Sequence, residues 1–174
     1  EESVRRIRSI ALVHETLSRE DGDDVDFGEI VRPLVRMVEE GLTSPDVPVE
    51  FVIEGGAGKL PSPEATSLAV VTTELLQNVV DHAYPPGTLA PGERGRIRIV
   101  LANDQVVLRL AVIDDGAGLP ADFDPQTSDS LGLSIVRGLV EELGGQMEFT
   151  AVQPGSRRPG NRVQLVLPVV SRVE

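Results

Sequence analysis

The sequence of 174 residues predicts an α+β fold: a two-layer α/β sandwich in which helices cover one face of a mixed, mostly antiparallel sheet. Apolar residues alternate with polar ones over 97–101, and a short polar turn then leads into a second, largely apolar strand over 105–113, which predicts a hairpin. A second pair of alternating segments, 146–152 and 162–167, encloses a turn-rich stretch. Helical periodicity occurs before and between these pairs. Hairpin pairing, together with helices that can share one face of the sheet, therefore predicts the two-layer arrangement.

The N-terminal residues 3–18 predict a helix with a narrow, coiled-coil-like apolar stripe, because Ile7, Ile10, His14 and Leu17 recur at helical spacing. The chain starts without methionine and already in this helical rhythm, so we expect a fragment of a longer protein. An acidic, glycine-containing interruption then separates this helix from the rest of the chain.

Capping and stop signals define the remaining elements. A second helix is expected over 26–41, with a bend at Pro33, followed by a strand over 47–53 and a glycine loop. A third helix is expected over 62–84, since Ser, Pro and Glu open it and two prolines follow it. The polar stretch 114–130 precedes a fourth helix, which ends at a pair of glycines.

Composition excludes several classes of protein. Sixteen Lys and Arg against 28 Asp and Glu give a net charge of −12, and aromatic residues make up 3%, so we expect no nucleic-acid partner. The absence of cysteine excludes disulfides and thiolate metal sites, and two histidines are too few for a His-based zinc site. No apolar stretch approaches the roughly 18 residues that a membrane span requires, so we expect no such span in this fragment.

The third expected helix places polar residues suited to a metal ion on one face. Glu74, Asn78 and either Asp81 or His82 lie at positions i, i+4 and i+7 or i+8, opposite an apolar face. Carboxylate and carboxamide oxygens are hard ligands, suited to Mg²⁺ and its waters. The alternative is an ordinary amphipathic helix whose polar face is solvated.

Two further motifs suit a flat, anionic ligand. Asp114 follows an apolar strand and precedes Gly116 and Gly118: the carboxylate can accept from an exocyclic amine, and the glycines let the backbone approach closely. Residues 130–133 open the fourth helix, where N–H groups and the positive end of the dipole form an anion site. The plainer alternatives are an Asp- and Gly-rich turn and N-capping by Ser130.

In this order and spacing the three motifs resemble those of the GHKL ATPase/kinase superfamily, which has the Bergerat fold and includes gyrase B, Hsp90, MutL and histidine-kinase catalytic domains. The resemblance covers about residues 25–170. It implies ATP and Mg²⁺ as cofactors. It also implies that Asn78 binds magnesium, that Glu74 orients a magnesium-bound water or acts as general base, and that Asp114 accepts from the adenine amine.

The same resemblance extends to the glycines and to a lid. Gly116 and Gly118 match the glycines of the adenine loop, Gly132 matches a phosphate-facing glycine, and 119–130 matches a lid over ATP that is short for the family. Further nucleotide-binding positions that it implies are Asp81, His82, Leu131 and Leu133.

Three positions depart from the family pattern. Asp81 stands where many histidine kinases carry a phosphate-binding Lys, which leaves the γ-phosphate contacts undefined. Asn161 stands where members often have Thr, and Asp115 where they often have Asn. A polar contact near adenine is therefore less defined on the side of Asn161.

Residues 4–18 resemble the second dimerisation helix of sensor kinases of the HisKA_2 type, including PdtaS-like kinases, in which the phosphoacceptor His lies on the preceding helix. We therefore expect 1–20 to be the last helix of a dimerisation and phosphotransfer region, and 21–174 to be the catalytic ATP-binding domain. His14 lies on the apolar stripe, and we interpret it as an interface residue, with phosphoacceptor as the alternative.

The resemblance implies a cytoplasmic two-component histidine kinase that is a homodimer when intact. It would transfer the γ-phosphoryl group of ATP to an upstream His and have a response regulator as partner. The alternative is an anti-sigma-factor serine/threonine kinase of the same superfamily, whose members share the Asn…His-Ala-Tyr pattern that ends here at Tyr84. A third hypothesis, a scaffold that has lost ATP binding, is opposed by the intact Glu74, Asn78 and Asp114.

Overall fold

The computed structural model describes residues 11, 15, 24–42, 47–128 and 130–169. The N-terminal helix expected over 3–18, with His14, lies outside the described residues except for Ala11 and Glu15, which are helical and exposed. In the described ranges, no helix has the length and apolar character needed to cross a membrane. The elements in chain order are β1 (Asp24–Asp26), α2 (Phe27–Leu42), β2 (Val49–Gly55), β3 (Lys59–Pro61), α3 (Ser62–His82), β4 (Gly95–Asn103), β5 (Val107–Asp114), α4 (Leu131–Glu142), β6 (Gln146–Thr150) and β7 (Asn161–Pro168).

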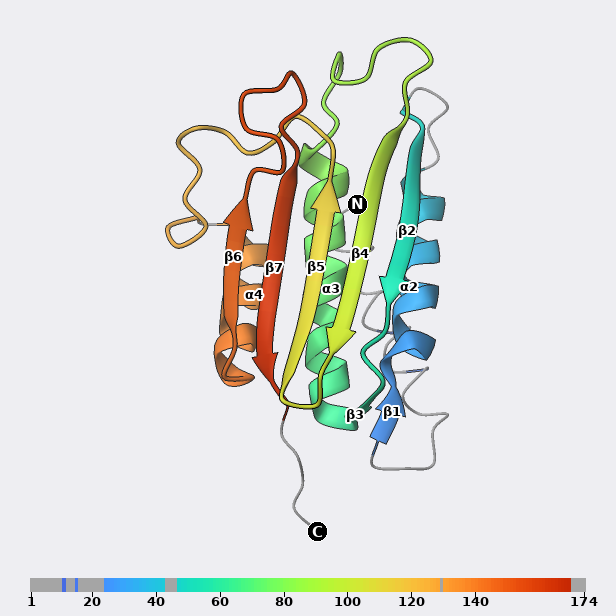
Figure 1. The fold of residues 1–174 in the computed structure, drawn as a ribbon, viewed down its shortest axis with the longest axis vertical. Coiled ribbons are helices and arrows are strands. Elements are labelled where there is room, and N and C mark those ends of the chain that lie inside the picture. The colour runs from blue at the N-terminus through green and yellow to red at the C-terminus, as the bar shows by residue number, and fades with distance from the viewer. Residues whose placement is uncertain (1–10, 12–14, 16–23, 43–46, 129, 170–174) are drawn as a thin grey trace.

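Five strands form one sheet in the order β2-β4-β5-β7-β6. β2 runs parallel to β4, whereas the pairs β4–β5, β5–β7 and β6–β7 are antiparallel. Figure 1 shows α2, α3 and α4 side by side behind this sheet, so the helices form one layer and the strands the other. The predicted two-layer α+β sandwich with a mixed, mostly antiparallel sheet is confirmed.

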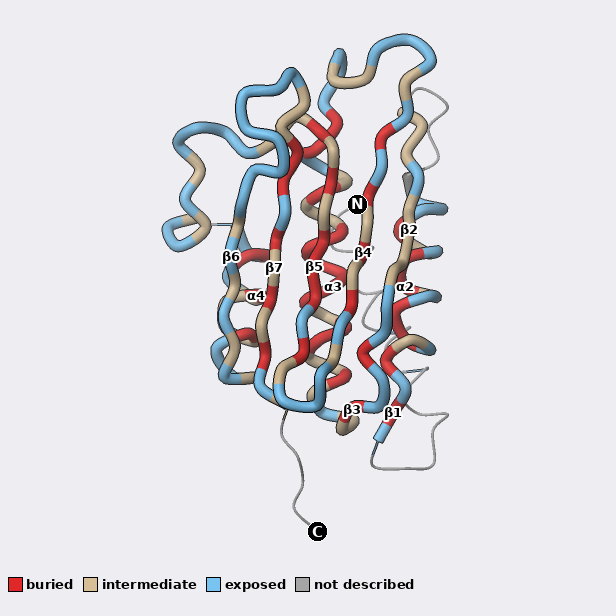
Figure 2. The backbone as a smooth tube through the Cα atoms, viewed as in Figure 1, coloured by how far each residue is buried: buried red, intermediate tan, exposed pale blue. Residues whose placement is uncertain are grey.

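The core between the two layers is aliphatic, and α3 is its central helix. α3 packs against α2 on one side and α4 on the other, and its Leu68, Leu75 and Leu76 are at most 1% exposed. From the sheet, Ile97 and Ile99 point into the same core, and Figure 2 shows buried and more exposed positions alternating along the strands. Burial of each such side chain contributes about 1.5–3 kcal/mol to folding, so these residues fix how α3 sits on the sheet.

The functional motifs meet at one end of the sheet because α3 and β5 both end there. α3 ends at His82 and β5 at Asp114. The two ends are joined directly, since the N–H of Ala117 donates to the carbonyl oxygen of Ala83 over 2.8 Å. The loop between β6 and β7 reaches the same end of the molecule (Figure 1).

A few details differ from the sequence-based expectations. β1 and β3 form a small antiparallel sheet, with Val25 opposite Leu60, that we did not predict, because strands of three residues are too short for alternation to identify. α2 includes Pro33 within its helical span, as the sequence predicts, and the bend expected there stays a prediction. α3 ends at His82, and Tyr84 lies beyond it with its side chain buried against the sheet end.

Candidate functional site

A cavity of about 530 Å³ lies where α3 and β5 end. Asn78 and His82 of α3, Asp114 at the end of β5 and Gly118 in the following loop line it. Five apolar side chains add further lining: Leu75, Val79, Phe123, Phe149 and Val163. A concave, largely apolar cavity of this size with a few convergent polar groups is typical of a small-ligand site.

Asp114 is the buried acid of this cavity. Its side chain is 3% exposed, and its Oδ1 accepts a hydrogen bond from the N–H of Gly116 over 2.9 Å. Burial raises the pKa of Asp114 to about 6, and the hydrogen bonds from the backbone N–H groups of Gly116 and Asn161 oppose this rise. Asp114 therefore places a buried acceptor at the wall of an apolar cavity, and the exocyclic amine of a base is a suitable donor for it.

Asn161 provides a second buried acceptor in the same cavity. It lies directly opposite Asp114 in the register of β7 and β5 and is 7% exposed. Its Oδ1 is buried and accepts no hydrogen bond from the described protein groups. An unsatisfied buried acceptor costs about 1–3 kcal/mol, so this atom also indicates a ligand that donates. The sequence marked Asn161 only as a departure from the family pattern, because the pairing of β5 with β7 that brings it beside Asp114 was not known.

The two glycines after Asp114 have different reasons to be glycine. A Cβ on Gly116 would lie 2.1 Å from the carbonyl oxygen of Ala83, so Gly116 permits the loop to pack on the end of α3. It is not among the residues that line the cavity. Gly118 does line the cavity and has a φ of +77°, where a side chain is strained. Of the two, only Gly118 is therefore placed for contact with a ligand.

The polar face of α3 divides between the cavity, the interior and the solvent. Asn78 is half-buried and lines the cavity, and His82 is exposed at its edge. Glu74, one turn before Asn78, is 6% exposed and is not among the lining residues. Asp81 is exposed, lies outside the lining and accepts a hydrogen bond from the Nε2 of Gln77 over 2.9 Å. Of the four polar residues that the sequence predicted for this face of α3, only Asn78 and His82 therefore line the cavity.

The opening of α4 lies beside the cavity. Ser130 and Leu133 line it, and the side chain of Ser130 accepts from the N–H of Leu133 over 3.2 Å, so the N-cap is present. Leu131 is 63% exposed and points away, while Gly132 is buried but not a lining residue. Only Leu133 of the expected Leu-Gly-Leu triplet therefore contacts the cavity directly.

The lid over the cavity is held by a residue that the sequence did not indicate. Arg137 of α4 donates from Nη1 to the carbonyl oxygen of Pro125 over 2.5 Å and from Nη2 to that of Ser128 over 3.1 Å. Phe123 of the lid packs against Phe149 of β6, with ring centroids 5.8 Å apart. Hydrogen bonds to irregular main chain leave no spacing pattern in a sequence, which explains why Arg137 was missed.

The donor set fits a magnesium ion that binds together with a phosphate ligand. Within the described part of the chain, no three His, Cys, Asp or Glu side chains form a group that could hold a metal alone. Asn78 offers one carboxamide oxygen at the cavity, and Glu74 lies one helical turn before it. Mg²⁺ keeps several waters and is commonly bound by one or two protein oxygens plus substrate phosphates, so such a sparse set suits it.

Two family profiles match the sequence. Residues 64–171 match the family described as histidine kinase-, DNA gyrase B- and HSP90-like ATPase. Residues 1–41 match a histidine kinase family, HisKA_2. The first match includes both the polar face of α3 and the glycine loop.

Relatives among curated proteins are sensor kinases. Sensor histidine kinase PdtaS of Mycobacterium tuberculosis is 38% identical over 172 residues, which are 98% of this chain and 32% of that protein. Blue-light-activated histidine kinase 2 of Erythrobacter litoralis is 34% identical over 102 residues, 59% of this chain and 28% of that protein. The chain thus spans about a third of the length of the curated relatives it matches.

Solved structures share the fold. The histidine kinase domain of the Erythrobacter litoralis EL346 blue-light-activated kinase has a TM-score of 0.76 at 22% identity, covering 97% of this chain and 75% of that one. The mycobacterial sensor histidine kinase MprB has a TM-score of 0.62 at 23% identity, covering 84% and 96%. At such identities the likeness concerns the fold alone, which is that of histidine kinase catalytic domains.

Proposed function

Because this chain belongs to the family of histidine kinase-, DNA gyrase B- and HSP90-like ATPases, we propose that it binds Mg-ATP in the cavity beside α3 and acts as the catalytic domain of a sensor histidine kinase. The observation that carries the proposal is the pair of buried acceptors, Asp114 and Asn161, side by side in one apolar cavity. In the binding mode that the family implies, Asp114 accepts from the 6-amine of adenine, where guanine has a carbonyl, so we expect Asp114 to favour adenine.

The chain's own residues divide the ligand between two ends of the cavity. Asp114 and Asn161 take the base, and Gly118 lets the loop approach it. Asn78 would hold the magnesium ion, with Glu74 one helical turn before it on α3 as the acid that would orient the metal's water. Leu133 and the opening of α4 lie toward the phosphates. Magnesium, when bound, neutralises phosphate charge and orients the transferred group.

We assign the wider activity from the relatives. Sensor histidine kinases transfer the γ-phosphoryl group to a His, and a response regulator is the partner of such a system. The intact protein would then be a cytoplasmic homodimer that pairs through residues 1–20, which belong to the segment that matches HisKA_2. That match also favours a sensor kinase over an anti-sigma-factor kinase. His14, on the apolar stripe of its segment, serves the interface and not as the phosphoacceptor.

Titration calorimetry with Mg-ATP and Mg-GTP tests the binding step. We expect binding of ATP and a much weaker response to GTP, because guanine has a carbonyl at the position of the adenine amine from which Asp114 accepts a hydrogen bond. Equal affinity for the two nucleotides would contradict the assignment of the base pocket.

Incubation with γ-labelled ATP and magnesium tests the role of His14. We expect no acid-labile, alkali-stable label on this chain. Such a label that disappears in His14→Gln would make His14 the acceptor. Acid-stable label on a serine of a bound partner would instead support the anti-sigma-factor kinase.

A further inference from the structure

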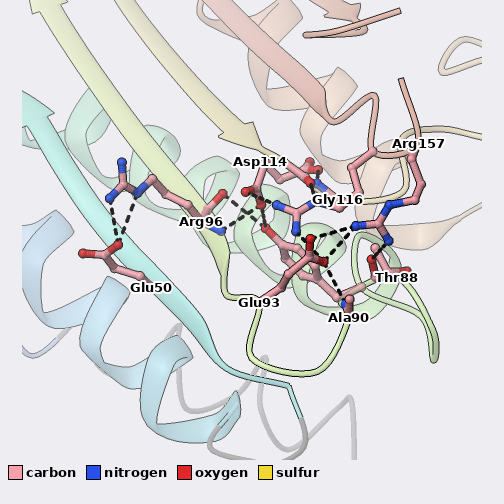
Figure 3. A network of polar contacts seen from close by, with 11 residues as sticks. Glu50, Thr88, Ala90, Glu93, Arg96, Asp114, Gly116 and Arg157 are labelled. Carbon is pink, nitrogen blue, oxygen red and sulfur yellow. Dashed lines mark hydrogen bonds and ion pairs between the residues drawn. The ribbon is translucent and has the colours of Figure 1, made fainter. Parts of the chain in front are cut away.

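Asp115, the acid that follows the adenine-facing Asp114, joins several segments through polar contacts and does not line the cavity. Figure 3 shows the surrounding network, with Arg96, Glu93 and Arg157 among its labelled members. Its Oδ1 accepts from the O–H of Tyr84 over 2.7 Å and from the backbone N–H of Arg96 over 2.8 Å. Its Oδ2 contacts the guanidinium of Arg158, whose Nε donates to the carbonyl oxygen of Asp115 over 2.8 Å. One residue of the glycine loop is thus bound to the end of α3, the start of β4 and the β6–β7 loop.

Arg158 is the most buried arginine of this network. Its side chain is 18% exposed, whereas that of the neighbouring Arg157 is 61% exposed. Tyr84 is 9% exposed, and burial, ahead of the hydrogen bond to Asp115, raises the pKa of Tyr84 above its ordinary range, so it remains a donor. The guanidinium and the hydroxyl therefore satisfy the Asp115 carboxylate from two different segments.

The backbone around this network leaves the loop little room to shift. The N–H of Gly160 donates to the carbonyl oxygen of Gly116 over 3.0 Å. A Cβ on Gly118 would lie 2.7 Å from the Cγ of Pro159, the residue after Arg158. The β6–β7 loop thus packs along the glycine loop, and Arg158 is the residue that joins the two by charge.

We propose that Arg158 is a positioning residue for base recognition: through its bidentate contact with Asp115 it holds the glycine loop so that Asp114 faces the ligand's amine. The inference rests on the proposed function and adds a residue to it that does not line the cavity. An Asp at position 115, where relatives of the superfamily often have Asn, brings a second negative charge beside Asp114, and Arg158 neutralises it. Loss of Arg158 therefore weakens binding through the base and not through the phosphates.

Arg157 is a matched control in the same loop. It donates to Glu93 over 2.8 Å and to the carbonyl oxygen of Thr88 over 3.1 Å, and Figure 3 shows it on the outer side of the network. It has the same charge and shares Glu93 with Arg158, but its hydrogen bonds and ion pair go to Glu93 and Thr88 and not to Asp115. Removal of the Arg157 side chain therefore tests the attachment of the β6–β7 loop and leaves the contact between Arg158 and Asp115 in place.

The experiment measures affinity for ATP and for inosine triphosphate, which has a carbonyl in place of the adenine amine, in wild type, Arg158→Met and Arg157→Met. We expect Arg158→Met to lower ATP affinity about fivefold, in the range of a partly exposed charged hydrogen bond, and to leave inosine triphosphate within about twofold. The ratio of the two affinities should fall in Arg158→Met and stay near the wild-type value in Arg157→Met.

Asp115→Asn keeps an acceptor for Tyr84 and for the Arg96 N–H but removes the charge that pairs with Arg158, so it provides a second variant should Arg158→Met fold poorly. We expect it to lower the same ratio, and the double variant to lose less than the sum of the two single changes. An unchanged ratio in folded Arg158→Met, or in Asp115→Asn if the former does not fold, would overturn the inference, as would an equal fall in Arg157→Met. Failure of the wild type to bind ATP at all would instead remove the proposed function.

Discussion

The two walls of the cavity are held by different kinds of contact. On the base side, Asp114 and Asn161 lie opposite each other on paired strands, and both are less than a tenth exposed. On the lid side, residues 119–128 are mostly exposed, and Arg137 holds them through two main-chain carbonyl groups. The first wall is therefore part of the sheet, and the second is a loop attached by the two hydrogen bonds of Arg137 and by the packing of Phe123 on Phe149.

This difference predicts which half of the ligand binds to a wall that is already ordered before binding. Two paired strands inside a sheet separate only when the sheet itself unfolds. The acceptors on these strands, Asp114 and Asn161, are therefore already in place, and ligand binding requires little further ordering of them. A loop with few buried contacts opens locally, so we expect the lid to gain order only when the proposed nucleotide binds. Substitutions in the base wall should thus change affinity far more than substitutions in the lid.

Asp114→Asn breaks the base wall and should have the largest effect. The N–H of Gly116 keeps the amide oxygen at the place of Oδ1, so the amide NH₂ group faces the ligand's amine and two donors meet. We expect ATP affinity to fall about 100-fold or more, as for other sites whose hydrogen bonding is mismatched. Calorimetry measures the loss, and thermal unfolding confirms that the variant is folded.

Asp104→Asn is the control for that change. Asp104 lies in the β4–β5 turn, at the opposite end of β5 from Asp114, and accepts from backbone N–H groups as Asp114 does. ATP affinity should be unchanged in this variant. A full retention of affinity in Asp114→Asn would remove Asp114 from the site.

Asn78→Ala separates the phosphate end of the cavity from the base end. With the carboxamide gone, we expect magnesium to raise ATP affinity about tenfold less than in wild type, while adenosine affinity stays within about twofold. Gln77→Ala is the matched control, because Gln77 is the next residue on α3 and pairs with Asp81 outside the cavity. An equal loss for adenosine would show that Asn78 contacts the base.

The sequence predicted the layers and the order of elements because alternation, caps and stop signals are local. It also predicted Asp114, Asn78 and Gly118, which the structure brings to one cavity, since each belongs to a short motif. It could not predict that Gly116 packs on α3 or that Asn161 sits beside Asp114, because both depend on pairing between distant segments.

Pairing between distant segments also explains why the sequence did not predict the polar network around Asp115. Arg158 and Asp115 are 43 positions apart in the chain, and the loop that carries Arg158 has no periodic pattern. Glu74 and Asn78 share a face of α3 by spacing, but only the packing of α3 against the rest of the core decides that one is buried and the other lines the cavity. Their separate roles as water acceptor and magnesium ligand stay predictions.

The pH dependence of adenosine binding tests whether the ionised carboxylate of Asp114 is the acceptor in the base wall. The pKa of Asp114 is raised to about 6 by burial, so the carboxylate predominates above this value and gains a proton below it. We expect adenosine affinity to be constant above about pH 7 and to fall severalfold as the pH is lowered to about 5, because the acceptor is being protonated. Adenosine is used because ATP phosphates titrate in the same range, and Asp114→Asn should show no such dependence.

Stability of the free protein should change in the opposite sense. Since the folded pKa of Asp114 lies above its ordinary value of 3.8, its contribution to the free energy of unfolding is most favourable below about pH 4 and is lost as the pH rises through about 6. The loss is at most about 3 kcal/mol. Denaturant unfolding should therefore find Asp114→Asn more stable than wild type at pH 8, with a smaller difference at pH 4. No pH dependence of this difference would place the carboxylate in contact with solvent.

Arg137→Met tests the lid wall and should have the smallest effect. It removes both hydrogen bonds from α4 to the carbonyl oxygens of Pro125 and Ser128 but keeps the apolar part of the side chain. The lid then opens more often, so we expect ATP to dissociate about threefold faster and the ratio of ATP to inosine triphosphate affinity to remain that of wild type.

Arg109→Met is a control, since Arg109 pairs with Asp104 in the turn at the far end of β5. Stopped-flow release of a fluorescent ATP analogue measures the rate, and limited proteolysis within 119–128 measures how often the lid opens. Faster cleavage together with faster release would show that Arg137 restrains the lid. A loss of base discrimination in Arg137→Met would contradict the division of the cavity into two walls, because a change confined to the lid leaves Asp114 and Asn161 in their strands.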